Sequence, residues 1–257
     1  MTRTGLSVLA LFFSMPLSSP ASSGTEPDPS AWQRLLARYL DTAAADGIRR
    51  FRYGAVTPAD KASLDAYLAS MQAAKVSGLS AEAQRAFWIN LYNAGTVDAV
   101  LGAYPLESVR DIRVPGSASP GPWDARRFKV EGRELSLDDI ENGILRARWK
   151  DNRVHFALNC ASLGCPDLSA RAFTAANLDT LLEQGARAYL RSPRGASFTG
   201  DNLTLSSIFA WYRDDFGKTD RELLETLSRY APADKGKRLR EYSGKIAYRY
   251  DWRLNGT

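Results

Sequence analysis

Residues Ser80–Leu101, SAEAQRAFWINLYNAGTVDAVL, predict the most strongly patterned helix of the chain. The apolar side chains of this stretch recur at the three- and four-residue spacing of one helix face: Phe87, Leu91, Ala94, Val97 and Leu101. Asn90 and Asn93 lie within or beside that face, where a buried amide without a partner costs about 1–3 kcal/mol. Both amides are therefore expected to be paired, and two alternatives stay open. Either they bind the backbone of a loop, or they line a polar pocket and position a substrate or stabilise an oxyanion.

Further helices are expected on both sides of this one. Thr57-Pro58-Ala59-Asp60 combines an N-cap, a proline at the first helical position and an acidic third residue, so it predicts a helix from residue 58. Ser136-Leu-Asp-Asp139 and Thr219-Asp-Arg-Glu222 are capping boxes that predict two more. Apolar periodicity predicts the remaining helices near residues 32–43, 178–189 and 206–217.

Four segments are expected to be extended. Phe128–Leu135 and Phe198–Leu205 are typical of hairpins, with turns at Glu131-Gly132 and Gly200-Asp201. Arg153–Asn159 is expected to be a strand, and residues 246–254 alternate apolar with charged side chains, which predicts a half-buried strand. The resulting fold class is α+β. We expect a single domain over residues 31–257, with about six to seven helices packed on a small, mainly antiparallel sheet that includes the C-terminal strand.

The first residues have the three parts of a secretory signal peptide. Arg3 precedes an apolar run over residues 6–17, and small residues follow over 18–24. We therefore expect a signal peptide over residues 1–23, a proline-containing linker over 24–30, and an exported protein that is periplasmic or extracellular. No transmembrane segment is expected after the signal peptide, because no later stretch approaches the ~20 apolar residues that a spanning helix needs.

Composition excludes several classes of protein. The chain of 257 residues is 44% hydrophobic and 25% charged, which is typical of a globular domain of one ordinary core. Its formal net charge of +5 comes from basic residues scattered among 29 acidic ones, and no zinc-finger spacing or aromatic-interleaved basic groove is present. Nucleic acid is therefore not an expected partner. Glycine-rich phosphate loops are absent as well, and no cofactor is expected.

Residues 153–166, RVHFALNCASLGCP, contain the only histidine, His155, and the only cysteines, Cys160 and Cys165. In an exported protein the two cysteines could form a local disulfide across their short loop. Alternatively, Cys160 is a thiol nucleophile, which needs a nearby base and surroundings that favour the thiolate. If residues 155–160 stayed extended, His155 would stand about 16 Å from Cys160, too far to serve as that base. No metal site is expected, because the spacing lacks paired close ligands.

Six ordered blocks of the sequence resemble the domain-of-unknown-function 547 family, and the resembling domain is expected to span about residues 30–255. The blocks are residues 87–93 (FWINLYN), 137–141 (LDDIE), 153–158 (RVHFAL), 160–166 (CASLGCP), 208–217 (IFAWYRDDFG) and 250–255 (YDWRLN). The resemblance implies one α+β domain, often exported in bacteria, whose signature is the asparagine helix and the cysteine loop. The family pattern usually has histidine after the glutamate, whereas this chain has Asn142. If family chemistry used that histidine with the cysteine, this chain has lost its base or uses His155 instead.

Two hypotheses for the function follow. In the first, Cys160 is the nucleophile of a hydrolase or acyltransferase acting on an amide or thioester-like bond. His155 is then its base or orienting residue, Glu141 supports the site as a carboxylate, and the amides that contact substrate are Asn90, Asn93 and Asn142. In the second, the protein is a non-catalytic binding or scaffold domain with a local Cys160–Cys165 disulfide. Under either hypothesis the partner is a small molecule, a peptide or a ligand of the cell envelope.

Overall fold

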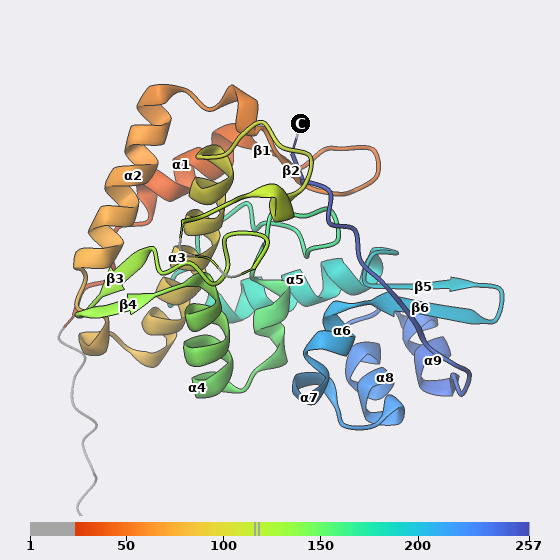
Figure 1. The fold of residues 1–257 in the computed structure, drawn as a ribbon. Helices are drawn as coiled ribbons and strands as arrows, with labels where there is room; N and C mark the ends of the chain where they lie inside the picture. Colours follow the sequence, from red (N-terminus) through yellow and green to blue (C-terminus); the bar gives the residue numbers. More distant parts are fainter. Residues whose placement is uncertain (1–23, 116, 118, 257) are drawn as a thin grey trace, which may run out of the picture.

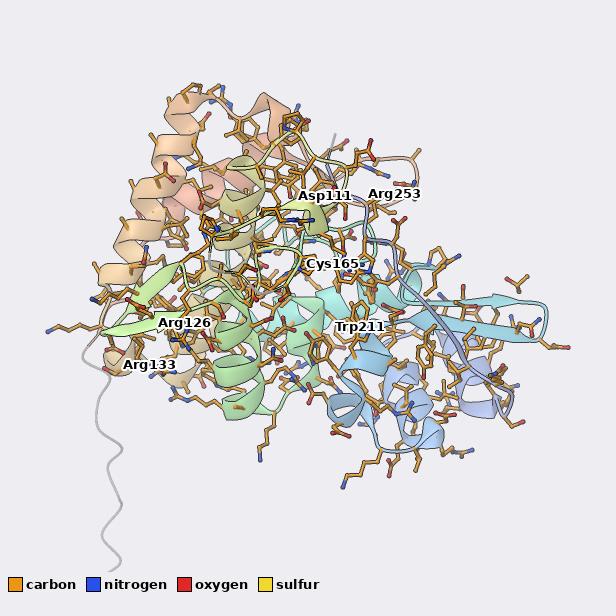
Figure 2. All side chains as sticks on the ribbon, in the orientation of Figure 1. Asp111, Arg126, Arg133, Cys165, Trp211 and Arg253 are labelled. Carbon is orange, nitrogen blue, oxygen red and sulfur yellow. The ribbon has the colours of Figure 1, made fainter. Side chains whose placement is uncertain are left out.

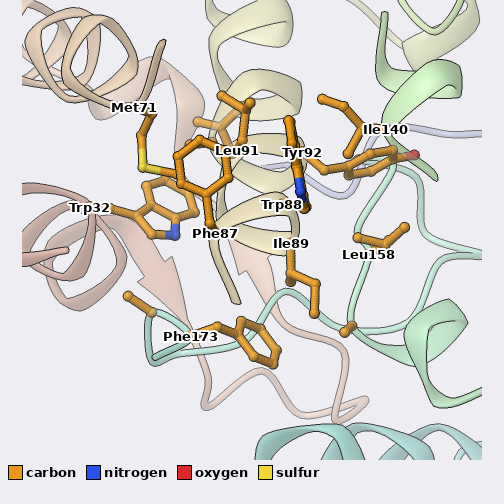
Figure 3. Packing of buried hydrophobic residues seen from close by; sticks show 14 of the residues in the cluster. Trp32, Met71, Phe87, Trp88, Ile89, Leu91, Tyr92, Ile140, Leu158 and Phe173 are labelled. Atoms are coloured by element: carbon orange, nitrogen blue, oxygen red, sulfur yellow. The ribbon is translucent and has the colours of Figure 1, made fainter. Parts of the chain in front are cut away.

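Helix α3 (Ala81–Leu101), which the sequence predicts, lies at the centre of the protein. Ser80 is its N-cap, with the Ser80 hydroxyl accepting a hydrogen bond of 3.2 Å from the Ala83 N–H. Nearly every side chain from Ala83 to Val100 is buried. Figure 3 shows why the helix can be apolar on more than one side: Phe87 packs toward Trp32 and Met71, whereas Tyr92 points to the opposite side. A helix surrounded in this way is a core helix rather than an amphipathic surface helix.

The computed structural model describes residues 24–115, 117 and 119–256. Besides α3, the α-helices are α1 (Ser30–Tyr39), α2 (Pro58–Ala73), α4 (Ala147–Trp149), α5 (Leu178–Arg191), α6 (Ile208–Trp211), α7 (Arg213–Phe216), α8 (Asp220–Ser228) and α9 (Ala233–Glu241). Segment η4 (Asp139–Arg146) is a π-helix, and the short 3₁₀ helices are η1 (Tyr53–Ala55), η2 (Val76–Gly78), η3 (Val109–Asp111) and η5 (Asn152–Phe156). The strands are β1 (Leu40–Asp41), β2 (Arg50–Phe51), β3 (Phe128–Val130), β4 (Arg133–Leu135), β5 (Ala196–Thr199), β6 (Asn202–Ser206) and β7 (Ala247–Arg249).

The strands form three small sheets, and most of their pairing is antiparallel. β1 pairs with β2, β3 with β4, and β5 with β6, each antiparallel, whereas β7 adds to β6 in parallel. The α+β class, the mainly antiparallel pairing and the inclusion of a C-terminal strand are confirmed. The predicted sheet is divided into three parts because helices separate the hairpins along the chain.

Several local predictions are confirmed by the hydrogen bonds that they require. The hydroxyl of Thr57 accepts the Asp60 N–H at 3.2 Å, and Ser136 and Asp139 each accept the other's backbone N–H at 3.0 Å. The Thr219–Glu222 box is formed as well. In the β3–β4 hairpin, Glu131 and Gly132 have positive φ angles of 47° and 79°, which is the geometry that two-residue hairpin turns favour.

Three predicted elements differ from the structure. The segment expected as a strand at 153–159 is instead the 3₁₀ helix η5, because the Asp151 carboxylate accepts the Arg153 N–H at 2.9 Å and starts a turn. The first helix ends at Tyr39 rather than near residue 43, since the next two residues pair as β1. The helix expected over 206–217 is divided into α6 and α7 at Tyr212, whose ψ of 36° is not helical.

The expected C-terminal strand is also shorter than its alternation predicts. Regular pairing covers only β7, and its three side chains are exposed rather than half-buried. Beyond it, the chain crosses the molecule beside the cysteine loop, and the carbonyls of Asp251 and Arg253 accept the N–H groups of Gly164 and Leu163 at 2.8 Å each. The segment therefore replaces ladder pairing by hydrogen bonds to a loop.

Buried apolar residues form two clusters. The larger cluster packs α1, α2, α3 and the residues up to Leu182, and the smaller one packs the end of α5 with the segments from β5 to residue 246. Figure 1 shows the two groups side by side, with the chain after β7 running from the second group across to β1 and β2 of the first. The boundary between the clusters passes through η5, since Phe156 belongs to the smaller cluster and Leu158 to the larger.

The signal peptide predicted for residues 1–23 lies outside the described residues. Residues 24–29 of the predicted linker have no regular secondary structure, but they pack on the domain, with the Gly24 N–H donating to the Gly78 carbonyl at 3.0 Å. None of the helices in the described ranges is both long enough and apolar enough to span a bilayer.

Candidate functional site

A pocket of about 190 Å³ lies where the two clusters meet. Its polar lining comes from Ser119, Asp138, Glu141, His155, Cys160 and Cys165. Its aromatic lining comes from Tyr92, Trp123, Trp211, Tyr212, Tyr250 and Trp252. Figure 2 places Cys165 in the middle of the molecule and Trp211 on α6 below it. Three of the residues predicted for catalysis, Glu141, His155 and Cys160, thus share one pocket although they lie on different elements.

The turn of η5 brings His155 and Cys160 to the same pocket. The extended geometry expected for residues 155–160 would have placed them on opposite faces, and that expectation is wrong because η5 is helical. Cys160 is followed by Ala161, whose φ of 63° is unusual for a residue with a side chain. Such backbone conformations persist only where surrounding contacts enforce them, and they are enriched at functional sites.

Those enforcing contacts lie behind the cysteine loop. Asn159 receives the Ala161 N–H at 3.0 Å on its side-chain oxygen and donates its amide to the Pro166 carbonyl at 2.8 Å. The Asn255 N–H donates to the Ala161 carbonyl at 2.9 Å. At Gly164 a Cβ atom would stand only 2.7 Å from the Asp251 backbone nitrogen, so a residue without a side chain is required there. The loop is therefore held from both sides, and its front faces the pocket.

The Cys160 sulfur has two hydroxyl neighbours. Its Sγ lies 3.0 Å from the Tyr250 hydroxyl and 3.1 Å from the Ser162 hydroxyl, and these two hydroxyls are 2.9 Å apart. Burial alone would raise the pKa of the Cys160 thiol, but its hydrogen bonds with Cys165, Ser162 and Tyr250 outweigh burial and lower that pKa to about 7. The pKa of Cys165 is raised instead, by burial and by the neighbouring Cys160. The two thiols are consequently unequal, with Cys160 the more acidic and the more accessible.

Both cysteines are free thiols in the structure. The predicted alternative of a Cys160–Cys165 disulfide is therefore not formed here, although the two residues are in contact: the Cys160 N–H donates to the Cys165 sulfur at 2.9 Å. That contact orients the buried sulfur behind the accessible one.

His155 is buried between two carboxylates. Its Nε2 lies 2.6 Å from Oδ2 of Asp215, and its Nδ1 lies 3.5 Å from Oε1 of Glu141. Burial lowers the pKa of His155, but the hydrogen bonds with Asp215 and Glu141 more than offset burial, and the pKa is raised overall. An imidazole whose two nitrogens both face carboxylates is a proton donor to them. The structure thus supports an orienting role for His155 rather than the role of base toward Cys160.

Asp215 continues this chain of contacts to Arg146. The Arg146 guanidinium donates to both oxygens of Asp215, at 2.6 and 3.1 Å. Burial opposes ionisation of Asp215, yet His155 and Arg146 hold its pKa well below its usual range. The Tyr212 ring is a neighbour of both cations, 4.2 Å from the His155 ring centroid and 4.6 Å from the Arg146 Cζ. These four side chains form a network that fixes the imidazole.

Glu141 lies on η4 and points into the protein rather than into water, with 7% of its surface exposed. Burial raises the pKa of Tyr212, and the charge and hydrogen bond of Glu141 raise it further, so that Tyr212 stays a neutral donor to the carboxylate. A π-helical turn often occurs at functional sites, and here it directs Glu141 to the pocket.

Asn90 and Asn93 bind the backbone of loops, which is the first of the two alternatives that the sequence left open; the other was that they line a polar pocket. Asn90 exchanges two hydrogen bonds with the backbone of Phe173, at 2.7 and 2.9 Å. Asn93 donates to the Ala157 carbonyl at 2.9 Å and accepts the Asn159 N–H at 2.8 Å. Neither amide lines the pocket. Their predicted role in contacting substrate or an oxyanion is therefore not what the structure supports; they fix the loops that precede and follow the cysteines.

Asn142, the third residue predicted to contact substrate, is exposed and also lies outside the pocket lining. Its side-chain oxygen accepts a hydrogen bond of 2.7 Å from Arg146. Asn142 therefore touches the His155 network only through Arg146 and Asp215.

Three residues that contact His155 or Cys160 carry no sequence-based prediction of a role: Asp215, Tyr250 and Ser162. Asp215 stands in the block 208–217 and Tyr250 in the last block, so both were visible as resemblance without an assigned partner. Their distances along the chain from His155 and Cys160, 60 and 90 residues, are the reason that spacing alone could not pair them. Within the described ranges, no group of three or more His, Cys, Asp and Glu residues is arranged to hold a metal ion.

Fold and site together define the class of protein, an α+β protein with a thiol and an imidazole–carboxylate network in one aromatic-lined pocket. Residues 76–190 match the family model described as "Protein of unknown function, DUF547", which supports the resemblance predicted from the sequence motifs. Four of the six resembling blocks lie within this segment, and the blocks 208–217 and 250–255 lie beyond it. The match includes Glu141, His155 and both cysteines. No curated protein and no solved structure matches the chain.

Proposed function

We propose that the protein is a thiol-dependent hydrolase or acyltransferase in which Cys160 is the nucleophile. The observation that carries the proposal is the pair of hydroxyls on the Cys160 sulfur, at 3.0 and 3.1 Å, in a pocket large enough for a substituent of a substrate. The thiolate rather than the thiol is the attacking species, and a pKa near 7 makes a large part of it available at neutral pH.

The proposed reaction has two steps. The Cys160 sulfur attacks an acyl carbon, so that a sulfur–carbon bond forms, the bond from that carbon to a nitrogen, oxygen or sulfur leaving group breaks, and the leaving group takes up a proton. Water, or another nucleophile that accepts the acyl group, then attacks the thioester and loses a proton, while the thiolate departs. Both steps need a group that gives and receives a proton within the pocket.

Glu141 is the residue that we propose for this proton transfer. It lines the same pocket as Cys160, and it is held by His155 on one side and by the Tyr212 hydroxyl on the other. His155 is then a positioning residue, because both of its nitrogens face carboxylates. Tyr250 and Ser162 would donate to the thiolate before attack and release it as the sulfur–carbon bond forms.

Alkylation of the purified, unreduced protein with iodoacetamide, followed by mass spectrometry over a range of pH, tests the nucleophile. The Cys165→Ser variant reports Cys160 alone, and the matched Cys160→Ser variant reports Cys165 alone. We expect Cys160 to react with a midpoint near pH 7 and Cys165 to react at least tenfold more slowly, since it is buried. An S–S bond in the unreduced protein, or equal rates for the two thiols, would contradict the proposal and favour a binding or scaffold domain.

A second measurement separates a reactive thiol from a catalytic one. Incubation with a p-nitrophenyl ester should produce an acyl adduct on Cys160, which mass spectrometry identifies, followed by its loss during turnover. Glu141→Gln should slow release of the adduct more than its formation. If no acylated Cys160 appears with activated esters, the thiol is reactive without being an acyl-transfer nucleophile.

A further inference from the structure

Asp138 is a carboxylate without a partner in the pocket. It lines the pocket from the position just before η4 and is half-buried, and its side chain makes no hydrogen bond or ion pair within the described part of the chain. Burial raises its pKa, and the charges of Glu141 and Asp124 raise it further, as expected where negative charges gather without a compensating cation.

Two of the cations near the pocket are already paired with carboxylates, and a third, Arg110, lies with its Cζ 5.4 Å from the centroid of the Trp252 ring. His155 stands between Glu141 and Asp215, and Arg146 is bound to both oxygens of Asp215. Two positive and two negative groups thus balance, and no lysine or arginine is among the described residues that line the pocket. The charge of Asp138 is therefore in excess, together with the partial charge of the Cys160 thiolate.

The pocket also offers aromatic faces. Trp211 is 51% exposed and stacks on Trp252, with ring centroids 5.4 Å apart and planes inclined by 27°. Tyr250 lies 4.6 Å from Trp252 and 4.8 Å from Trp211, and Trp123 meets Trp252 edge-on at 5.7 Å. Aromatic faces beside carboxylates are the combination by which proteins bind organic cations, since ring faces and carboxylates both attract positive charge.

We propose that this pocket binds an organic cation, an alkylammonium group held between the Trp211–Trp252–Tyr250 rings and the Asp138 carboxylate. The inference deepens the proposed function and rests on it for the reaction: the acyl compound processed by Cys160 carries such a group near its scissile bond. A cavity of about 150 Å³ holds one benzene ring. The pocket of about 190 Å³ thus admits a charged group with a short aliphatic or cyclic stem.

Binding to the Cys160→Ser variant tests the ligand class without any need for a reactive thiol. The probes are cyclohexylammonium, the neutral cyclohexanol and the anionic cyclohexanecarboxylate, which share one ring, and tryptophan fluorescence or calorimetry reports binding. We expect the cation to bind at least tenfold more tightly than the alcohol, and the carboxylate to bind more weakly than both. Equal affinity for cation and alcohol, or no binding of the cation, would overturn the inference.

Variants then locate the cation. In the Cys160→Ser background, Asp138→Asn should weaken cyclohexylammonium binding about tenfold and leave cyclohexanol binding unchanged, because only the charged partner is lost. Asp214→Asn is the matched control, since Asp214 is exposed and lies outside the pocket, and it should change neither affinity. Trp211→Ala should lower the affinity for both cyclohexylammonium and cyclohexanol, since an exposed ring face is removed.

The two proposals fail separately. Selective cation binding combined with an unreactive Cys160 would leave a cation-binding domain without catalysis. A reactive, acylated Cys160 combined with no preference among the three probes would leave an acyl-transfer enzyme with a different substrate class. An Asp138→Asn variant that binds cyclohexylammonium as well as the parent protein would also refute the assignment of that carboxylate.

Discussion

The segment matched by the family model and the chain after it contribute differently to one pocket. Residues 76–190 supply the groups with chemistry of their own, Glu141, His155 and Cys160. The later residues supply groups that contact two of these three: Asp215 binds the imidazole of His155, and Tyr250 binds the sulfur of Cys160. The reactive residues of this site can thus be recognised in one segment, while the pKa values of His155 and Cys160 depend on residues of both segments.

Within the first segment, the largest effect is expected from Asn93→Ala. The change leaves the buried Ala157 carbonyl and the Asn159 N–H without partners, and each such loss costs about 1–3 kcal/mol. The free energy of unfolding should therefore fall by about 3 kcal/mol, measured by urea denaturation. Asn142→Ala, at an exposed amide, is the control and should change it by less than about 0.5 kcal/mol. A small loss of stability in Asn93→Ala would show that the loop before Cys160 does not depend on these two hydrogen bonds.

Across the boundary between the segments, Asp215→Asn should lower the pKa of His155, because the variant loses the charged partner at 2.6 Å. His155 is the only histidine, so its imidazole NMR signals over a pH titration require no assignment. The lost charged hydrogen bonds should also cost about 1–3 kcal/mol of stability. Asp214→Asn removes the same charge from the neighbouring exposed residue and should leave the titration unchanged. If the His155 pKa were the same in Asp215→Asn as in the parent protein, Asp215 would not be a cause of the raised pKa.

The pKa shifts of His155 and Asp215 also predict how stability depends on pH. Since folding raises the pKa of His155, the stability that its protonation contributes is complete below its ordinary pKa of about 6.5 and is lost as pH rises through the folded value. Folding lowers the pKa of Asp215, so its contribution is present above its ordinary pKa of about 3.9 and is lost as pH falls through the folded value. The unfolding free energy should decline on the alkaline side less steeply in Asp215→Asn than in the parent protein.

The smallest effect is expected from Tyr250→Phe, which changes the acidity of the Cys160 thiol. Tyr250→Phe removes one hydroxyl from Cys160, so the midpoint of Cys160 alkylation should move from about pH 7 toward the ordinary thiol value near 8.5. Stability should change little, because the ring stays in place. Tyr248→Phe is the matched control, since its hydroxyl binds Arg213 away from the sulfur. A midpoint that does not move would assign the acidity of Cys160 to its own loop alone.

Local patterns predicted the elements of the fold well where side chains act on nearby backbone. The caps at Thr57, Ser136 and Thr219 and the turn at Gly132 are all formed, because each rests on contacts within a few residues. Periodicity failed in η5, where the Asp151 side chain started a turn, and after β7, where pairing with the cysteine loop replaced a strand ladder. In both cases hydrogen bonds outside the pattern determined the conformation.

The site could be predicted in part. The uniqueness of His155, Cys160 and Cys165 located the pocket, and Glu141 was predicted as a supporting carboxylate of the same site. The roles were harder: Asn90 and Asn93 satisfy loops, and His155 serves carboxylates that lie 14 residues before it and 60 after it. Which of several available partners a polar side chain chooses depends on tertiary geometry, which spacing in the sequence does not contain.

The crossing of residues 250–255 beside the cysteine loop also bears on the order in which the site is assembled. A polypeptide emerges from its amino end, so the thiol of Cys160 exists for the time needed to synthesise 90 more residues before the Tyr250 hydroxyl can reach it. During that interval the thiol lacks one of its two hydroxyl donors and two of the aromatic walls. The Cys160 thiol thus gains the hydrogen bond from Tyr250 only after residue 250 has been synthesised.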